Sequence, residues 1–226
     1  NEWIQDVRSE NIGANFSLFG IPLAVGFNTT TVSDIEIRTR PGEADAKFNA
    51  NFFWGSLSTG FEVVENIYFG TSLKYIYEGM LANEATGLGF DFGLVYNLPD
   101  EGVILAASVK NVGSMSELRN EATKLPSELR AGAGYSMDLN NLKSTVTFGA
   151  EFQKYLPTDD NHFLFGGEFF YDETIALRVG YQTGYEARNL SAGIGLKWGS
   201  LNFDYAYVPF KYNLGTGHLL SLTFSI

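Results

Sequence analysis

The chain has 226 residues, of which 45% are hydrophobic and 15% aromatic, with no cysteine and a formal net charge of −11. The absence of cysteine excludes disulfides and thiolate metal sites. The acidic balance argues against a nucleic-acid partner, because binding phosphates needs a basic surface. No stretch approaches 18 consecutive apolar residues, which excludes a transmembrane helix. A chain of this length fits one all-β domain or two small ones.

An alternation of apolar with small or polar residues runs through the whole chain. In Leu190–Trp198, for example, every second residue is apolar, and the pattern resumes after Gly199-Ser200. A period of two is the signature of β-strands. The only candidate helix is a short amphipathic piece near Trp3–Val7. Thirteen strands are predicted, at residues 9–18, 20–28, 47–63, 67–78, 87–97, 103–112, 128–137, 143–154, 163–171, 174–184, 190–198, 201–209 and 217–226.

The lengths of strands and connections favour a membrane barrel. Strands of soluble proteins usually have about five or six residues, whereas a tilted strand needs about 9–11 to cross a bilayer. Outer-membrane barrels alternate short periplasmic turns with longer extracellular loops. The expected short connections lie around 19, 64–66, 98–102, 138–142, 172–173 and 199–200, and the long ones at 29–46, 79–86, 113–127, 155–162, 185–189 and 210–216.

These features predict an all-β fold in which residues 1–226 form a single antiparallel transmembrane β-barrel. The alternative is a large soluble barrel or sandwich that holds a ligand. Single-chain bacterial barrels normally have an even number of strands. With the C-terminus in the periplasm, the first and last of thirteen strands both run downward. We therefore expect a fourteenth strand before Asn1 and a chain that lacks an N-terminal portion.

The two rows of the alternation suit two different surroundings. Charges in the centre of a buried sheet are costly unless they are paired, whereas in a barrel lumen they can pair or meet water. The apolar row is then expected to face lipid, with girdle aromatics at Trp54, Tyr96, Tyr135, Tyr185 and Trp198. The charged residues expected to face the lumen are Lys74, Asp91, Lys110, Arg130, Glu151, Glu168, Arg178, Lys197 and Asp204.

The sequence offers little to a catalytic mechanism. His162 and His218 are far apart and lack ligand-like spacing partners, so surface or rim positions are expected for both. Asp159 and Asp160 lack EF-hand spacing and favour a solvated turn. We therefore expect no enzymatic activity, no cofactor and no metal site.

One long loop contains the best candidates for binding. Asp34, Glu36, Arg38 and Arg40 lie in "DIEIRTR". An arginine fork pairs with carboxylates in fixed geometry, so this loop can contact a partner. The alternative is an internal salt bridge from the arginines to Glu36, Glu43 or Asp45, which would fold the loop over the mouth of the barrel.

Several motifs resemble the PorV/PorQ group of outer-membrane proteins, relatives of the FadL-type fatty-acid channels. The resemblance covers essentially the whole chain, and "DIEIRT" and the last 35 residues are its most specific parts. The glycine-rich N-terminal region of the family, with its "NPAGL"-like motif, is absent, and the last residue is Ile226 rather than an aromatic. The motifs are "EWIQDVRSENIG", "DIEIRT", "LKYIYEGM", "GFDFGLVYNL", "VKNVG", "LPSELRAGAGY" and "LNFDYAYVPFKYNLGTGHLLSLTF".

The resemblance implies a bacterial outer-membrane protein with a role in type nine secretion. In that role the barrel binds an exported protein at its extracellular loops, as a scaffold or shuttle. A FadL-like passive channel for hydrophobic small molecules is the alternative, and a structural barrel in a larger envelope assembly is a third. A continuous apolar tunnel would favour transport, whereas a charge-paired lumen with exposed loops would favour the scaffold. The inward apolar residues that could line a tunnel are Ile76, Val95, Ile104, Leu164, Phe170 and Val208.

Overall fold

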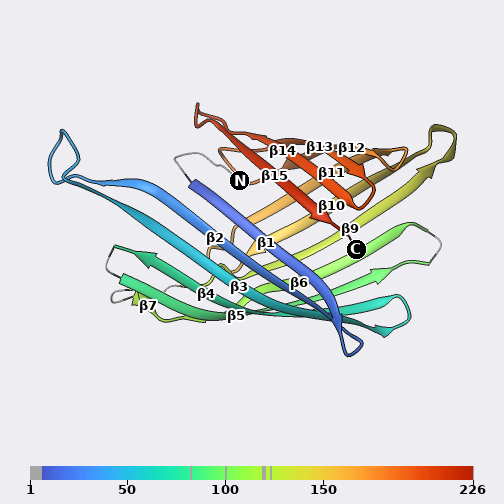
Figure 1. The fold of residues 1–226 in the computed structure, drawn as a ribbon, viewed down its shortest axis with the longest axis horizontal. Coiled ribbons are helices and arrows are strands. Elements are labelled where there is room, and N and C mark those ends of the chain that lie inside the picture. Colours follow the sequence, from blue (N-terminus) through green and yellow to red (C-terminus); the bar gives the residue numbers. More distant parts are fainter. Residues whose placement is uncertain (1–6, 82, 100, 119–120, 123, 226) are drawn as a thin grey trace.

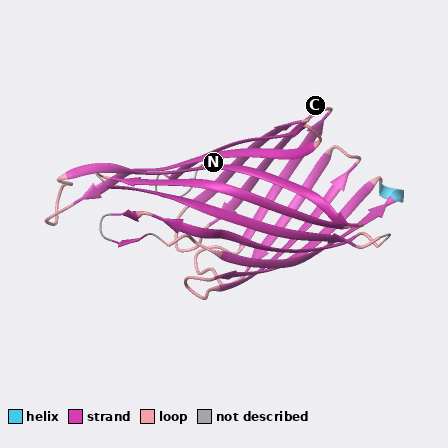
Figure 2. Ribbon diagram, turned by 90° about the horizontal axis from the view of Figure 1, so that it is seen from below, coloured by secondary structure: helices cyan, strands magenta, loops and turns pink. Residues whose placement is uncertain are grey.

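The computed structural model describes residues 7–81, 83–99, 101–118, 121–122 and 124–225. Thirteen strands in these ranges form one antiparallel sheet, in which each strand pairs with the next along the chain. The sheet is tilted and curls like the wall of a barrel (Figures 1 and 2). The all-β barrel architecture predicted from the alternation is thereby confirmed. Within the described residues, no helix is long and apolar enough to cross a membrane.

The strand bounds agree with the sequence prediction except at the loop ends. A further pair of two-residue strands, β7 and β8, forms a separate small hairpin between β6 and β9. A single 3-10 turn, η1 (Asn140–Leu142), connects β9 to β10. The strands are β1 (Val7–Leu18), β2 (Ile21–Ile37), β3 (Ala46–Val64), β4 (Ile67–Met80), β5 (Asn83–Asn97), β6 (Val103–Met115), β7 (Glu117–Leu118), β8 (Glu121–Ala122), β9 (Glu128–Leu139), β10 (Ser144–Tyr155), β11 (Asn161–Tyr171), β12 (Ile175–Gln182), β13 (Leu190–Trp198), β14 (Leu201–Pro209) and β15 (Thr216–Phe224).

The two edges of the sheet are β1 and β15, and no backbone ladder joins them among the described residues. Because the sheet has an odd number of antiparallel strands, β1 and β15 run in the same direction. A strand running the opposite way between them would pair antiparallel with both. The expected fourteenth strand stays a prediction.

The sheet has two chemically different faces. One row of side chains is apolar and exposed, as for Trp198 at 85% exposure and Leu222 at 71%. The opposite row carries small and polar side chains that are mostly half-buried, such as Lys74 and Asp91. We call these rows the outer and the inner face. An apolar face that is exposed along almost every strand has no protein core to pack against, which is the condition of a barrel wall in lipid.

The connections also fall into two groups, one at each end of the sheet. At the short-turn end they are 19–20, 65–66, 98–102, 140–143, 172–174 and 199–200. At the other end, called here the long-loop end, they are 38–45, 81–82, 116–127, 156–160, 183–189 and 210–215. The loop expected at 79–86 is therefore wrong. β4 and β5 continue to Met80 and from Asn83 because their backbone ladder persists where the side chains become polar.

Strand length varies strongly around the sheet. β2 and β3 have 17 and 19 residues, whereas β12 to β15 have 8 or 9. The hairpin of β2 and β3, blue in Figure 1, accordingly projects beyond its neighbours at the long-loop end. At about 3.4 Å per residue, β3 is about 65 Å long. The strand expected at 20–28 is thus much longer than predicted.

Three positions differ from the sequence prediction. Trp54 pairs with Asn28 and Ile76 on the inner face, so it is not a lipid-facing girdle residue. Tyr185 lies in a loop and stacks on His162, so it is not in the girdle either. The helix expected near Trp3–Val7 falls mainly on residues 1–6, which lie outside the described residues, and Val7 itself begins β1.

Among the described residues, the sheet holds one small buried apolar cluster. Ala85, Met115 and Leu125 are buried, and Ile76 and Leu118 pack against them. Ile76 and Ala85 belong to the inner face of β4 and β5, because Ile76 pairs with Gly87 in the row that contains Asp91. Leu125 lies between β8 and β9, so this part of the connection folds onto the inner face.

Candidate functional site

The inner face carries all nine charged residues assigned to it from the sequence. The register between neighbouring strands places all nine on the same face of the sheet, from Lys74 on β4 to Asp204 on β14. Most of them meet in three separate clusters. Each cluster contains a cation and at least one carboxylate from another strand.

The first cluster joins β4, β5 and β6. The Lys74 ammonium lies 2.6 Å from an Asp91 carboxylate oxygen and donates to the Asn111 side-chain oxygen at 2.9 Å. The Asn111 backbone N–H donates to the same carboxylate at 2.8 Å. Both charged side chains are less than one-fifth exposed. A lysine with two oxygen partners on neighbouring strands ties the three strands together.

The second cluster joins β9 and β10 near the long-loop end. Arg130 donates to Glu128 at 2.9 Å and to Glu151 at 2.9 Å. The Gln153 amide also donates to Glu128, and both of these side chains are buried. One guanidinium therefore serves two carboxylates, and the buried Glu128 has no other cation within ion-pair distance among the described residues.

The third cluster spans four strands. Arg178 donates to Glu168 and to Asp204, at 2.5 Å each. Glu168 is the direct neighbour of Arg178 on β11, but Asp204 lies on β14, beyond β13. Gly195 makes this reach feasible, since a Cβ there would lie 2.7 Å from the Asp204 oxygen and 3.1 Å from the Arg178 nitrogen. Glycine at this position leaves the space through which the guanidinium passes.

Two inner cations stand outside these clusters. Lys110 and Lys197 form no ion pair within 4 Å among the described residues. In the backbone register, Lys110 lies opposite Glu128 on β9, and Lys197 lies opposite Asn202 on β14. Each of the other seven charged residues assigned from the sequence has an oppositely charged partner within 4 Å, so most of the inner wall offers paired charges rather than free ones.

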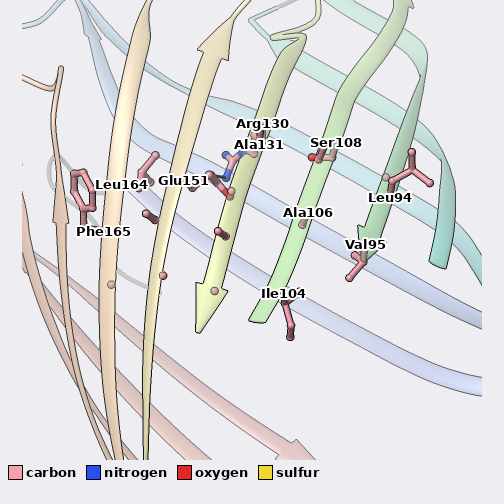
Figure 3. A pocket seen from close by; sticks show the side chains of 18 residues that line it. Leu94, Val95, Ile104, Ala106, Ser108, Arg130, Ala131, Glu151, Leu164 and Phe165 are labelled. Carbon is pink, nitrogen blue, oxygen red and sulfur yellow. Dashed lines mark hydrogen bonds and ion pairs between the residues drawn. The ribbon is translucent and has the colours of Figure 1, made fainter. Parts of the chain in front are cut away.

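Two hollows lie along the sheet between the clusters. One, of about 690 Å³, extends over β5, β6, β9, β10 and β11. Figure 3 shows the Arg130 and Glu151 side chains at its edge and Ile104 further along the wall. The second hollow, of about 660 Å³, continues toward β3 and shares Gly93, Val95 and Ser108 with the first. The described chain leaves this part of the wall uncovered.

The two histidines have different surroundings. His162 is buried at the long-loop end, where its ring stacks on Tyr185 with centroids 3.9 Å apart and Nδ1 lies 3.0 Å from the Thr183 carbonyl oxygen. His162 thus lies at the rim of the sheet, one of the two positions expected, but it is buried rather than exposed because the Tyr185 ring covers it. His218 lies on the outer face, with its two ring nitrogens within 2.9 Å of the Tyr205 and Thr216 hydroxyls.

The tip of the β2–β3 hairpin is folded by its own polar groups. Arg38 donates to the Glu36 carboxylate and to the Gly42 carbonyl oxygen. The Thr39 backbone N–H and hydroxyl donate to Asp45 at 2.6 and 2.8 Å. The hydrogen bonds from Arg38 lower the pKa of Glu36, and those from Thr39 lower the pKa of Asp45.

These contacts decide between the two sequence interpretations for part of the loop. Arg38 forms the internal salt bridge, and Asp34 pairs with Lys47 at 3.3 Å. Arg40 is exposed and forms no ion pair in the described residues. Among the four candidate contact residues, Arg40 alone therefore presents an uncompensated charge at the tip.

Sequence reasoning missed several residues of these sites. Glu128 lies two positions before Arg130 on β9, and Gln153 lies two positions after Glu151 on β10. Residues two positions apart share a face of a strand, so the alternation could have found both. Asn111 could not be found in this way, because its left-handed backbone (φ +57°) interrupts the alternation at a bulge. No group of three or more His, Cys, Asp or Glu side chains in the described part of the chain is arranged to hold a metal ion.

Comparison with known proteins adds little to this picture. No protein-family model matches the chain, and no curated protein matches it. Among solved structures, it is similar to a mutant of the Rh. blastica porin, with 9% identity, a TM-score of 0.42 and coverage of 97% of this chain and 90% of that one. Identity and score this low assign neither family nor activity, so the assignment of the fold depends on the sheet itself.

Proposed function

We propose that this protein is a bacterial outer-membrane β-barrel of PorV/PorQ type that binds a protein partner at its extracellular side, as a scaffold or shuttle linked to type nine secretion. The projecting β2–β3 hairpin is the observation that carries the proposal. A strand needs about 9–11 residues to cross a bilayer, and β3 has 19. Roughly half of this hairpin is therefore available outside the membrane.

The outer face of the hairpin shows where the bilayer would end. Phe27 and Phe53 stack on this face with ring centroids 6.5 Å apart. Toward the tip, the next pair on the same face is polar, since the Thr31 hydroxyl donates to Asn51 at 3.1 Å. Aromatic side chains concentrate at membrane interfaces. This change from an aromatic to a polar pair along the hairpin therefore supports a membrane–water interface at Phe27 and Phe53, with the tip in water.

The orientation follows from the loops. Outer-membrane barrels place short turns in the periplasm and longer loops outside. The short-turn end would then be periplasmic, and the hairpin tip with Arg40 extracellular. A stiff projection beyond the membrane is of little use for passing small solutes, but it is suited to contact with another protein.

The proposal is tested by removing the projection without disturbing the barrel. Val32 and Ala50 are direct cross-strand partners, so replacing residues 33–49 by Asn-Gly would rejoin them through a two-residue turn. The matched control replaces residues 140–143 at the opposite end in the same way. Each barrel is purified from its native membrane in mild detergent, and bound proteins are identified by mass spectrometry.

The unaltered barrel and the control should retain a stoichiometric secreted or secretion-machinery protein, and the trimmed barrel should lose it. A barrel that purifies without protein, or a trimmed barrel that retains the same partner, would contradict the proposal.

The two hollows favour a second candidate function. Their lining includes Val95, Ile104 and Leu164 beside small residues, which suits a passive channel for hydrophobic small molecules. The three charge clusters argue against a continuous apolar route, since they interrupt the inner wall on β4, β9 and β12. Co-purification of hydrophobic molecules with a protein-free barrel would favour the channel over the scaffold.

A further inference from the structure

We propose that residues 124–127 form a strap that is folded onto the inner wall and fixed there by Asn111, and that this strap controls access to the wall of β4 and β5 from the long-loop end. This inference concerns the lumen and does not depend on the protein partner proposed above. It rests on the packing of Leu125 and on the bonds of Asn111.

Leu125 anchors the strap by apolar contact. Its side chain is 5% exposed and packs with Ala85, which is 1% exposed, and with Met115. A Cβ placed on Gly89 of the inner wall would lie 3.5 Å from Leu125 Cδ1 and 3.4 Å from Ile76 Cδ1. Leu125 therefore lies directly on the wall. Burial of a leucine side chain contributes substantially to holding a loop in place.

Asn111 fixes the same segment by hydrogen bonds. Its side-chain NH2 donates to the Pro126 carbonyl oxygen at 3.1 Å, and its own carbonyl oxygen accepts from the Ser127 hydroxyl at 2.7 Å. Its side-chain oxygen and backbone N–H are held by Lys74 and Asp91. The Lys74–Asp91 ion pair thus positions Asn111, and Asn111 positions the strap.

The left-handed backbone of Asn111 explains why an asparagine serves here. Asparagine adopts a positive φ more readily than most residues, and this conformation turns its side chain toward the strap. Each of its four polar groups has a partner in the structure. A residue that uses all its hydrogen-bonding groups between a wall and a loop acts as a latch.

The connection is also fixed where it leaves β6 and where it enters β9. At its start, Ser116 exchanges two bonds with Thr86 of β5: its backbone N–H donates to the Thr86 carbonyl oxygen at 2.7 Å, and its hydroxyl accepts from the Thr86 N–H at 2.9 Å. At the end, the Ser127 carbonyl oxygen accepts from the Leu156 N–H at 2.9 Å. The described parts of the loop are therefore held at its start, at Leu125 and at its end.

The absence of cysteine allows a direct test with single thiols. Ala85→Cys places a thiol under the strap, and Ser191→Cys places one on the inner face of β13, far along the sheet. In the full barrel, the reaction with a membrane-impermeant maleimide is timed for each. The Ala85→Cys thiol should react at least about tenfold more slowly, because local opening of the loop limits it.

The latch is tested in the same assay. Asn111→Gly keeps the positive φ and removes the side-chain bonds to Pro126 and Lys74. It should raise the rate at Ala85→Cys about tenfold, the usual order for a lost hydrogen bond to a charged or buried partner, and leave Ser191→Cys unchanged. Equal rates at the two thiols, or no effect of Asn111→Gly at Ala85→Cys, would overturn the proposal.

A second variant covers the event that Asn111→Gly fails to assemble. Asn111→Asp keeps the shape and the oxygen that Lys74 contacts, and loses the bond to Pro126. It should raise the rate at Ala85→Cys in the same direction, and an unchanged rate would again overturn the latch. Partner capture by the β2–β3 hairpin is a separate readout, so the strap and the scaffold can fail independently.

Discussion

Gly195→Ala is expected to break the bridge between Arg178 and Asp204. The new methyl carbon would lie 2.7 Å from the Asp204 oxygen, 3.1 Å from the Arg178 nitrogen and 3.2 Å from Ala176 Cβ. The bridge therefore has to move or break. The pair is partly exposed to solvent, which limits its contribution to about 1 kcal/mol, and the strain from overpacking adds about 1 kcal/mol or more. We expect a loss of about 2 kcal/mol of unfolding free energy.

The assay is denaturant unfolding of the reconstituted barrel, with Gly149→Ala as the matched control. Gly149 lies on the same face, and the nearest atom to its added Cβ is 4.0 Å away, so this control should change stability by less than about 0.5 kcal/mol. Asp204→Asn should cost stability in the natural sequence and much less in the Gly195→Ala background, because the bridge is already lost. Equal effects of the two alanine variants, or full additivity with Asp204→Asn, would refute the reasoning.

Two further predictions concern the second cluster and the hairpin tip. Arg130→Met should destabilise the barrel by about 3 kcal/mol in the same assay, because it leaves the buried Glu128 without its cation; Arg8→Met, which removes an exposed ion pair, should cost less than about 0.5 kcal/mol. Because the pKa of Asp45 is lowered from its ordinary value of 3.8, its carboxylate stays ionised when the pH falls below 3.8. Its contribution to tip order is then complete above that value and is lost only as the pH falls through the lower folded pKa. Hydrogen exchange of the Thr39 amide, followed from pH 6 downward, checks this, and loss of protection near pH 5 would contradict it.

The alternation of the sequence was sufficient to assign the faces, because side-chain direction in a strand depends only on parity. Trp54 shows the limit of reasoning from residue type. As an aromatic it was assigned to the lipid face, but its parity with Ser56 and Ser58 places it on the inner face. Following the row rather than the residue type would have given the right answer.

The ends of the strands at the long-loop end were harder to predict. The apolar alternation indicates which part of a strand faces lipid, but it does not indicate where the backbone hydrogen bonds between strands stop. Asn83 and Glu84 are polar and were assigned to a loop, yet they pair with Met80 and Gly79. Outside the bilayer, a strand keeps its backbone bonds while its outer side chains become polar. The strap was beyond prediction for another reason: the contact of Leu125 with Ala85 joins residues 40 positions apart, and no local pattern encodes it.

The charged side chains of the inner wall differ from those of the hairpin tip in whether they have partners. On the wall, Lys74, Arg130 and Arg178 each contact a carboxylate on another strand, so these charges act mainly between strands and hold the sheet in shape. A solute that approached these groups would compete with partners already at 2.5 to 2.9 Å. At the hairpin tip, internal bonds fix the loop but leave Arg40 exposed and without an ion pair among the described residues. An exposed arginine without an ion pair can accept a carboxylate of a partner protein, and for this reason we propose the partner site at the hairpin rather than on the wall.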